Sequence, residues 1–175
     1  MEDLHLSVQP MAEGTAEQQA AALFSAYLET LASIGWDMDT AVFRRFFCDD
    51  LPTQVPALRK HARLAADGAD CPCATSWVGQ APQPPTHVVL WAHHVRDPHG
   101  PLSKAWDGRT LTLRRDGLLH HWTTHLDFTG AGTVGEQTEG LFGVYVDLLA
   151  DRGLNLAKDV MRTWIYVRDI DDTYG

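Results

Sequence analysis

The stretch QAAALFSAYLETLASIGWDMDTAVFR, residues 19–44, decides the fold because the chain contains a second version of it. A shift of 118 positions places it without a gap on residues 137–162, QTEGLFGVYVDLLADRGLNLAKDVMR. Nine of the 26 aligned positions are identical, well above what unrelated sequences share. We therefore predict that the chain holds one and a half copies of a single unit.

In each copy, apolar residues recur at the spacing of one helical face, and a glycine follows them. The face in the first copy comprises Leu23, Phe24, Tyr27, Leu28, Leu31 and Ile34, followed by Gly35. The face in the second copy comprises Leu141, Tyr145, Leu148 and Leu149, followed by Gly153. This pattern predicts an amphipathic helix that a left-handed glycine terminates. A strand-like run follows each helix, at Ala41 to Cys48 and at Asp159 to Arg168.

The remaining segments predict an α+β architecture. Strands are expected at Leu4 to Val8, Ala74 to Gly79 and His87 to Val95, and a second helix at Thr53 to Ala66. A hairpin is predicted across the turn Asp116-Gly117, between Arg109 to Arg115 and Leu118 to Leu126. This order of elements predicts a mixed sheet with both helices on one face.

The repeat divides the chain into a first unit at residues 1–97, a linker at 98–108 and a second unit at 109–175. The first unit lacks a counterpart of the strand 109–115, and the second lacks counterparts of residues 58–95. Either the reading frame is truncated, or rearranged pairing or another chain supplies the missing parts. The sequence leaves both alternatives open.

Composition places the chain among globular proteins of a reducing compartment. Hydrophobic residues make up 45% of its 175 residues and charged residues 21%, an ordinary balance for a folded protein. A net charge of −9 disfavours phosphate backbones, so we expect no nucleic-acid partner. The sequence has neither a membrane-spanning apolar run nor a signal peptide, so we expect no membrane partner. Three cysteines without framework spacing favour the cytoplasm.

Four residues alternate along the predicted strand 159–168, so that their side chains share one face: Arg162, Trp164, Tyr166 and Arg168. Two guanidinium groups and a tyrosine hydroxyl on one face suit a small carboxylate. We therefore predict that Arg162, Tyr166 and Arg168 bind a ligand. The alternative is a half-exposed strand with solvated arginines.

Other reactive groups favour structural roles. The pairs His93-His94 and His120-His121 place neighbouring rings on opposite faces of a strand, so neither pair predicts a metal site. Cys71 and Cys73 lack a second pair of cysteines, so zinc is not expected. The glycine-rich segment 130–135 lacks the lysine of a phosphate-binding loop. We predict no metal and no cofactor.

The order of elements resembles the Rid superfamily, also called YjgF or endoribonuclease L-PSP. Its most specific stretches are residues 19–50, residues 72–95 with the segment PCATSWVGQ, and residues 159–169. The last stretch is also similar to the second Rid-like domain of chorismatases. The resemblance implies a chorismate-mutase-like α+β sandwich and a homo-oligomer, usually a trimer, with a ligand cleft between neighbouring subunits.

The resemblance also identifies residues that this chain lacks. Rid deaminases grip the substrate carboxylate with an arginine two residues after a proline, and here Ala74 holds that place after Pro72. The family glutamate that positions a water corresponds to about Val89. The Ser-Gly-Gln turn of the family cleft resembles Ser7-Val8-Gln9. In the second unit that turn corresponds to residues 125–127, which adds His125 to the predicted ligand-binding residues.

Two classes of function therefore remain open. One is an enzyme that hydrolyses a small carboxylate-bearing metabolite by chemistry other than standard imine deamination. The other is a non-catalytic Rid-like protein that binds a small molecule or serves as a scaffold. The missing arginine and glutamate favour the second class, the resemblance to chorismatases favours the first, and no catalytic residue is assigned.

Overall fold

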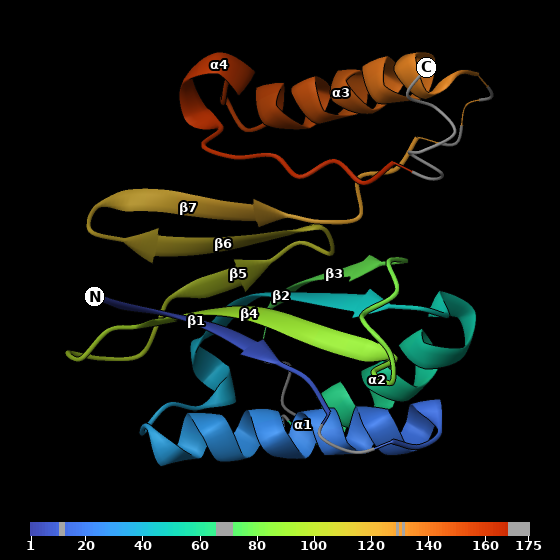
Figure 1. Cartoon of the computed structure of the whole chain (residues 1–175). Helices are drawn as coiled ribbons and strands as arrows, with labels where there is room; N and C mark the ends of the chain where they lie inside the picture. Colours follow the sequence, from blue (N-terminus) through green and yellow to red (C-terminus); the bar gives the residue numbers. More distant parts are fainter. Residues whose placement is uncertain (11–12, 66–71, 129, 131, 168–175) are drawn as a thin grey trace. The chain divides into compact units, whose positions relative to one another are not determined.

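The computed structural model describes residues 1–10, 13–65, 72–128, 130 and 132–167 (Figure 1). Its internal contacts divide the chain into two compact units, Met1–Thr124 and His125–Gly175. Each unit is described by itself.

A four-stranded mixed sheet forms the centre of the first unit. Its strands lie in the order β1 (Glu2–Val8), β4 (Val88–Arg96), β2 (Ala41–Cys48) and β3 (Ala74–Val78). β4 runs antiparallel to β1 and β2, whereas β2 and β3 are parallel. The mixed sheet predicted from the sequence is confirmed.

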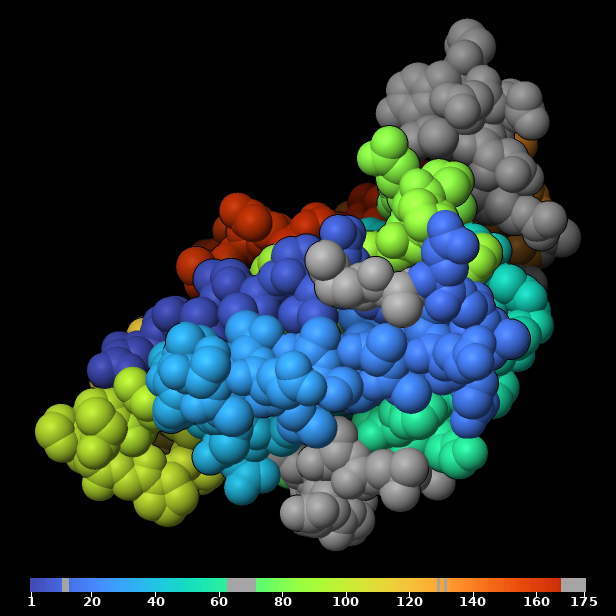
Figure 2. All heavy atoms as spheres, turned by 60° about the horizontal axis from the view of Figure 1, so that its bottom comes forward, coloured from blue at the N-terminus to red at the C-terminus, as the bar shows by residue number. Residues whose placement is uncertain are grey.

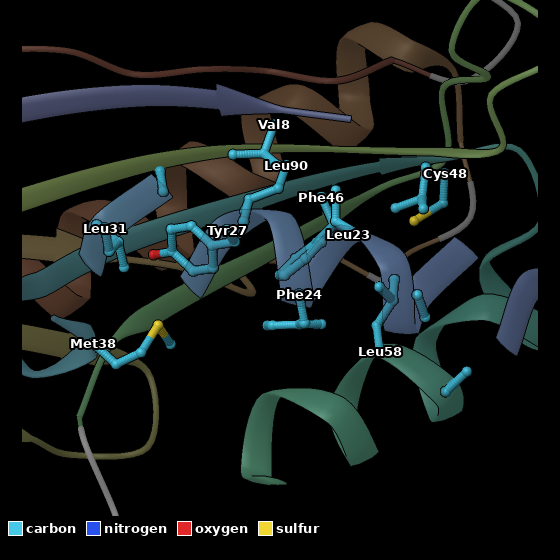
Figure 3. Packing of buried hydrophobic residues seen from close by; sticks show 14 residues of the cluster. Val8, Leu23, Phe24, Tyr27, Leu31, Met38, Phe46, Cys48, Leu58 and Leu90 are labelled. Carbon is cyan, nitrogen blue, oxygen red and sulfur yellow. The ribbon is translucent and has the colours of Figure 1, made fainter. Parts of the chain in front are cut away.

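Two helices cover one face of this sheet, as Figure 1 shows: α1 (Ala16–Ser33) and α2 (Leu51–Ala65). Figure 2 views this side, with α1 across the front. The core beneath the helices is drawn in Figure 3 and includes Val8, Leu23, Phe24, Tyr27, Leu31, Phe46, Leu58 and Leu90. The predicted apolar face of α1 is therefore confirmed up to Leu31. Ile34 differs, because it lies after the last helical residue and is 46% exposed.

A second, three-stranded antiparallel sheet packs on part of the helix-free face and leaves His5 and Ser7 of that face exposed. It comprises β5 (Lys104–Trp106), β6 (Thr110–Arg115) and β7 (Leu118–Thr123). The turn between β6 and β7 has positive φ at both central residues, 50° at Asp116 and 81° at Gly117, as the predicted hairpin requires. Its buried leucines form a second core with residues of the first sheet: Leu111, Leu113, Val42, Phe43, Ala74 and Val95.

The segment 98–108, predicted as a linker, contains β5, which pairs with β6 from Lys104↔Leu113 to Trp106↔Leu111. The hairpin 110–123 lies in the first compact unit. The three residues of β5 show no alternation of apolar and polar side chains, so the sequence gives no signal for a strand there. β5 is a strand because it pairs with β6. The predicted units 1–97 and 109–175 are defined by the sequence repeat, whereas the compact units are defined by contacts and divide at Thr124. The division by repeats therefore stays a prediction.

The second unit contains α3 (Val134–Ala150) and a one-turn helix, α4 (Leu156–Asp159). The segment 160–167 follows without ladder pairing to any described residue. The strand predicted at 159–168 is therefore wrong within the described residues. β-branched and aromatic composition favours extended backbone, but a strand also needs a neighbour in register.

The helices α1 and α3, which the shift of 118 positions aligns, begin and end with the same local geometry. Each begins with a capping box, Thr15 with Gln18 and Thr133 with Glu136. Each ends before a glycine with left-handed φ, 70° at Gly35 and 69° at Gly153, the conformation that closes a helix. This shared geometry agrees with a repeated helix. That the chain holds one and a half copies of a whole unit stays a prediction.

Candidate functional site

The residues predicted to bind a ligand fall in the second unit. The guanidinium carbon of Arg162 lies 5.4 Å from the ring centroid of Trp164, so residues two apart do point to one side. Tyr166 continues this segment and is 45% exposed. Arg168 lies outside the described residues. His125 is exposed, with φ at 56°, in the segment after β7. Their role as a ligand site stays a prediction.

The helix-free face of the first sheet presents rows of residues in register. One row runs across β1, β4, β2 and β3 as Ser7, Trp91, Arg45 and Ser76. The next row runs as His5, His93, Phe43 and Ala74. Residues in register on neighbouring strands point to the same face of a sheet. The position that holds the family arginine, here Ala74, therefore lies on this face.

The two positions that carry deamination in the Rid family are apolar in this structure. Ala74 is fully buried in the second core, beside Phe43 and Leu111. Val89 is partly buried and pairs with Phe47. Neither side chain can grip a carboxylate or hold a water for attack on an imine.

Arg45 brings a guanidinium to this face from the strand next to Ala74. Its guanidinium carbon lies 5.0 Å from the ring centroid of Phe43 and 5.8 Å from that of Trp91. The residue is only 7% exposed, so the rings hold the cation where solvent screening is weak. Sequence reasoning missed Arg45. The sequence did contain a signal, the pair Arg44-Arg45 within an apolar run. Because successive side chains of a strand point to opposite faces, one of these two arginines must lie on each face of the sheet.

Ring contacts extend from this row toward the edge of the sheet. The His5 ring stacks on Trp91 and on His93, at centroid distances of 5.6 Å and 4.3 Å. The His93 ring meets that of Trp122 edge to face at a centroid distance of 5.8 Å. His93 Nε2 is 3.0 Å from Asp3 Oδ1.

The carboxylate of Asp3 is the acidic group that contacts His93 at this edge of the sheet. It also pairs with Arg115, whose hydrogen bond and charge lower the pKa of Asp3 to about 2. Burial lowers the pKa of His93, so its imidazole stays neutral at pH 7.

The neighbouring histidine, His94, points to the opposite face and lies among the helices. Its Nε2 is 2.6 Å from the Tyr27 hydroxyl and its Nδ1 is 2.8 Å from the Thr40 hydroxyl. Burial lowers the pKa of His94 to about 3, and Arg44 adds to the effect. His94 is therefore a neutral structural residue.

The described residues contain no group of three or more His, Cys, Asp or Glu side chains placed to hold a metal ion. Burial raises the pKa of the Cys73 thiol, and Cys71 lies outside the described residues. Among the described helices, none combines the length and the apolar character needed to cross a membrane.

No protein-family model matches the chain, and no curated protein matches it. Among solved structures, a Rid-family protein of unknown function from Yersinia pestis is 21% identical, with a TM-score of 0.47 over 55% of this chain and 80% of that one. A YjgF-family protein from Streptococcus pyogenes is 16% identical, with a TM-score of 0.47 over 55% and 81%. A candidate endoribonuclease L-PSP from Entamoeba histolytica is 14% identical, with a TM-score of 0.48 over 54% and 80%. These names are those of the family that the sequence resembles.

Proposed function

We propose that this Rid-like chain binds a small carboxylate-bearing metabolite on the helix-free face of its first sheet, with Arg45 making the charged contact. The position of Arg45 carries the proposal. It lies one row from Ala74 on the neighbouring strand and the same face, close to where the family arginine would stand. Guanidinium groups suit carboxylates because two parallel N–H donors match two oxygens.

The surroundings of Arg45 support this role. Phe43 and Trp91 flank its guanidinium and restrict its orientation, so less side-chain entropy is lost when a ligand binds. Ser7 and Ser76 stand in the same row and offer hydroxyl groups for further hydrogen bonds. A carboxylate with a planar apolar body fits this combination of cation, rings and hydroxyls.

Binding without standard imine deamination is the function these residues support best, since Ala74 and Val89 supply no reactive group. Hydrolysis of the bound metabolite is a second candidate, which His93 favours. Its imidazole lies beside the Arg45 row, and a neutral imidazole can accept a proton from water.

A thermal-shift screen of the full chain tests the proposal. The ligands are pyruvate, 2-oxobutyrate, chorismate and 4-hydroxybenzoate, each compared with its methyl ester where one is stable. We expect at least one carboxylate to raise the melting temperature and its ester to have no effect. We expect Arg45→Met to abolish the shift.

Two variants locate the site. Arg59→Met is the matched control, because Arg59 also places a guanidinium 5.7 Å from a ring, that of Trp77, but on α2. Arg162→Ala tests the residues predicted from the sequence. A shift that survives Arg45→Met but disappears in Arg162→Ala would move the site to the second unit. No shift with any carboxylate would leave the scaffold interpretation, and product formation in the same mixtures would favour hydrolysis.

A further inference from the structure

A separate cleft of about 450 Å³ lies in the first unit, beyond the end of β2 and the start of β4, whereas Ala74 pairs with Phe43 near the start of β2. It forms where the residues before α1, the end of β2 and the loop before β4 meet, and Figure 2 shows that loop beside the start of α1. The residues that line it are Glu13, Gly14, Asp49, Ala81, Pro82, Pro84, Pro85, Thr86 and His87.

Two buried glutamines hold the backbone of His87 in this cleft. The His87 N–H donates to Gln19 Oε1 at 2.9 Å, and its carbonyl accepts from Gln54 Nε2 at 2.8 Å. Gln19 comes from α1 and Gln54 from α2, and they are 1% and 3% exposed. Two buried amide side chains on different helices therefore fix one histidine from both sides.

The imidazole of His87 is fixed as well. Its Nδ1 makes a short hydrogen bond to Asp49 Oδ2, and the other oxygen of Asp49 accepts from Gln54 Nε2 at 2.6 Å. A carboxylate can only accept here, so Nδ1 carries the proton of this hydrogen bond, and the tautomer with one ring proton has its lone pair on Nε2. The His87 side chain is 47% exposed, so water reaches it.

We propose that Asp49 and His87 form a hydrolytic dyad, in which His87 is the general base and Asp49 the positioning residue. His87 Nε2 takes a proton from water while the water oxygen bonds to the carbonyl carbon of a small ester. The C–O bond to the alcohol then breaks, and Nε2 returns the proton to the departing oxygen. One ester and one water give one carboxylic acid and one alcohol.

The cleft selects the charge of its substrate. Two of the described residues that line it are carboxylates, Glu13 and Asp49, and none of them is Lys or Arg. The three prolines add apolar surface. The substrate class is therefore a neutral or cationic small ester with an apolar body, which separates this site from the carboxylate site at Arg45.

Ester hydrolysis by the full chain tests the dyad. The probes are neutral p-nitrophenyl acetate, cationic acetylcholine and the anionic half-ester p-nitrophenyl succinate. We expect kcat/KM for the first two to fall at least about 100-fold in His87→Gln, the size of a general-base effect. The matched control His99→Gln removes an exposed histidine on the loop after β4 and should keep the wild-type rate. Wild-type rates no higher than those of His87→Gln, or preference for the anionic ester, would overturn the proposal.

Two readouts separate positioning from folding. Asp49→Asn should lower kcat while KM stays near the wild-type value, and added imidazole should restore activity to His87→Ala. Nitrogen-detected NMR of the unmodified protein should show the His87 proton on Nδ1. A proton on Nε2 in the free protein, or no imidazole rescue, contradicts the assigned roles.

Discussion

Acid should destabilise the first unit through one buried histidine, His94. Its ring nitrogens bond Tyr27 and Thr40, and Trp36 packs against its edge at a centroid distance of 6.3 Å. Burial lowers its pKa from 6.5 to about 3, with the charge of Arg44 as the next cause. Between these two values the unfolded chain binds a proton at this position, whereas the folded chain does not.

The sign and size follow from this difference in proton binding. Because the unfolded state binds more protons below pH 6.5, the free energy of unfolding falls as the pH falls. One pKa unit corresponds to about 1.4 kcal/mol, so lowering the pH from 7 to 4.5 should cost about 2.5 kcal/mol at His94 alone. The effect levels off below about pH 3, where the folded state also binds the proton.

Urea unfolding of wild type and His94→Gln at pH 7 and at pH 4.5 measures this effect. Glutamine keeps hydrogen-bonding groups near Tyr27 and Thr40 but cannot titrate. The variant starts less stable at pH 7, and wild type should lose about 2.5 kcal/mol more than the variant on acidification. Carboxylates and His93 titrate in both proteins, so their contributions cancel. Equal losses in both proteins would refute the reasoning.

Two further predictions concern the core and the start of α1. Leu23→Ala should lower the free energy of unfolding by about 2–5 kcal/mol, because Leu23 is fully buried between the helices and the sheet. Leu118→Ala, at a position that is 64% exposed, should change it little. Urea unfolding of both variants measures the difference. Thr15→Ala should cost about 1 kcal/mol through loss of the N-cap, and Thr15→Ser, which keeps the hydroxyl, should cost less; equal costs would contradict the capping role.

The elements that the sequence predicted well carry local signals. The face of α1 repeats at helical spacing, and Gly35 closes the helix in the left-handed conformation. Asp116-Gly117 specifies its hairpin through the two residues of the turn alone. Such features need no information from distant parts of the chain.

The parts that sequence reasoning missed depend on distant partners. The segment 160–167 has strand composition but no described neighbour in register, and β5 is a strand only because β6 pairs with it. The dyad joins Asp49 to a histidine 38 residues later and relies on Gln19, 68 residues before that histidine. Periodicity within one segment contains no information about such contacts.

One irregularity in pairing decides which arginine faces which side. The register of β2 with β4 shifts between Ala41↔His94 and Phe43↔His93, so β2 contains one extra residue there. Continued without the shift, the pairing would place Arg44 beside Trp91 and Arg45 beside Leu90, which lies in the core beneath the helices.

The shift therefore places Arg45 among the rings of the helix-free face. It leaves Arg44 near His94, where its charge helps keep that imidazole neutral. The proposed carboxylate site and the expected acid sensitivity of the core thus depend on the same extra residue. A deletion of this extra residue would exchange the faces of the two arginines: Arg44 would point to the helix-free face and Arg45 into the core. Both properties would then change together.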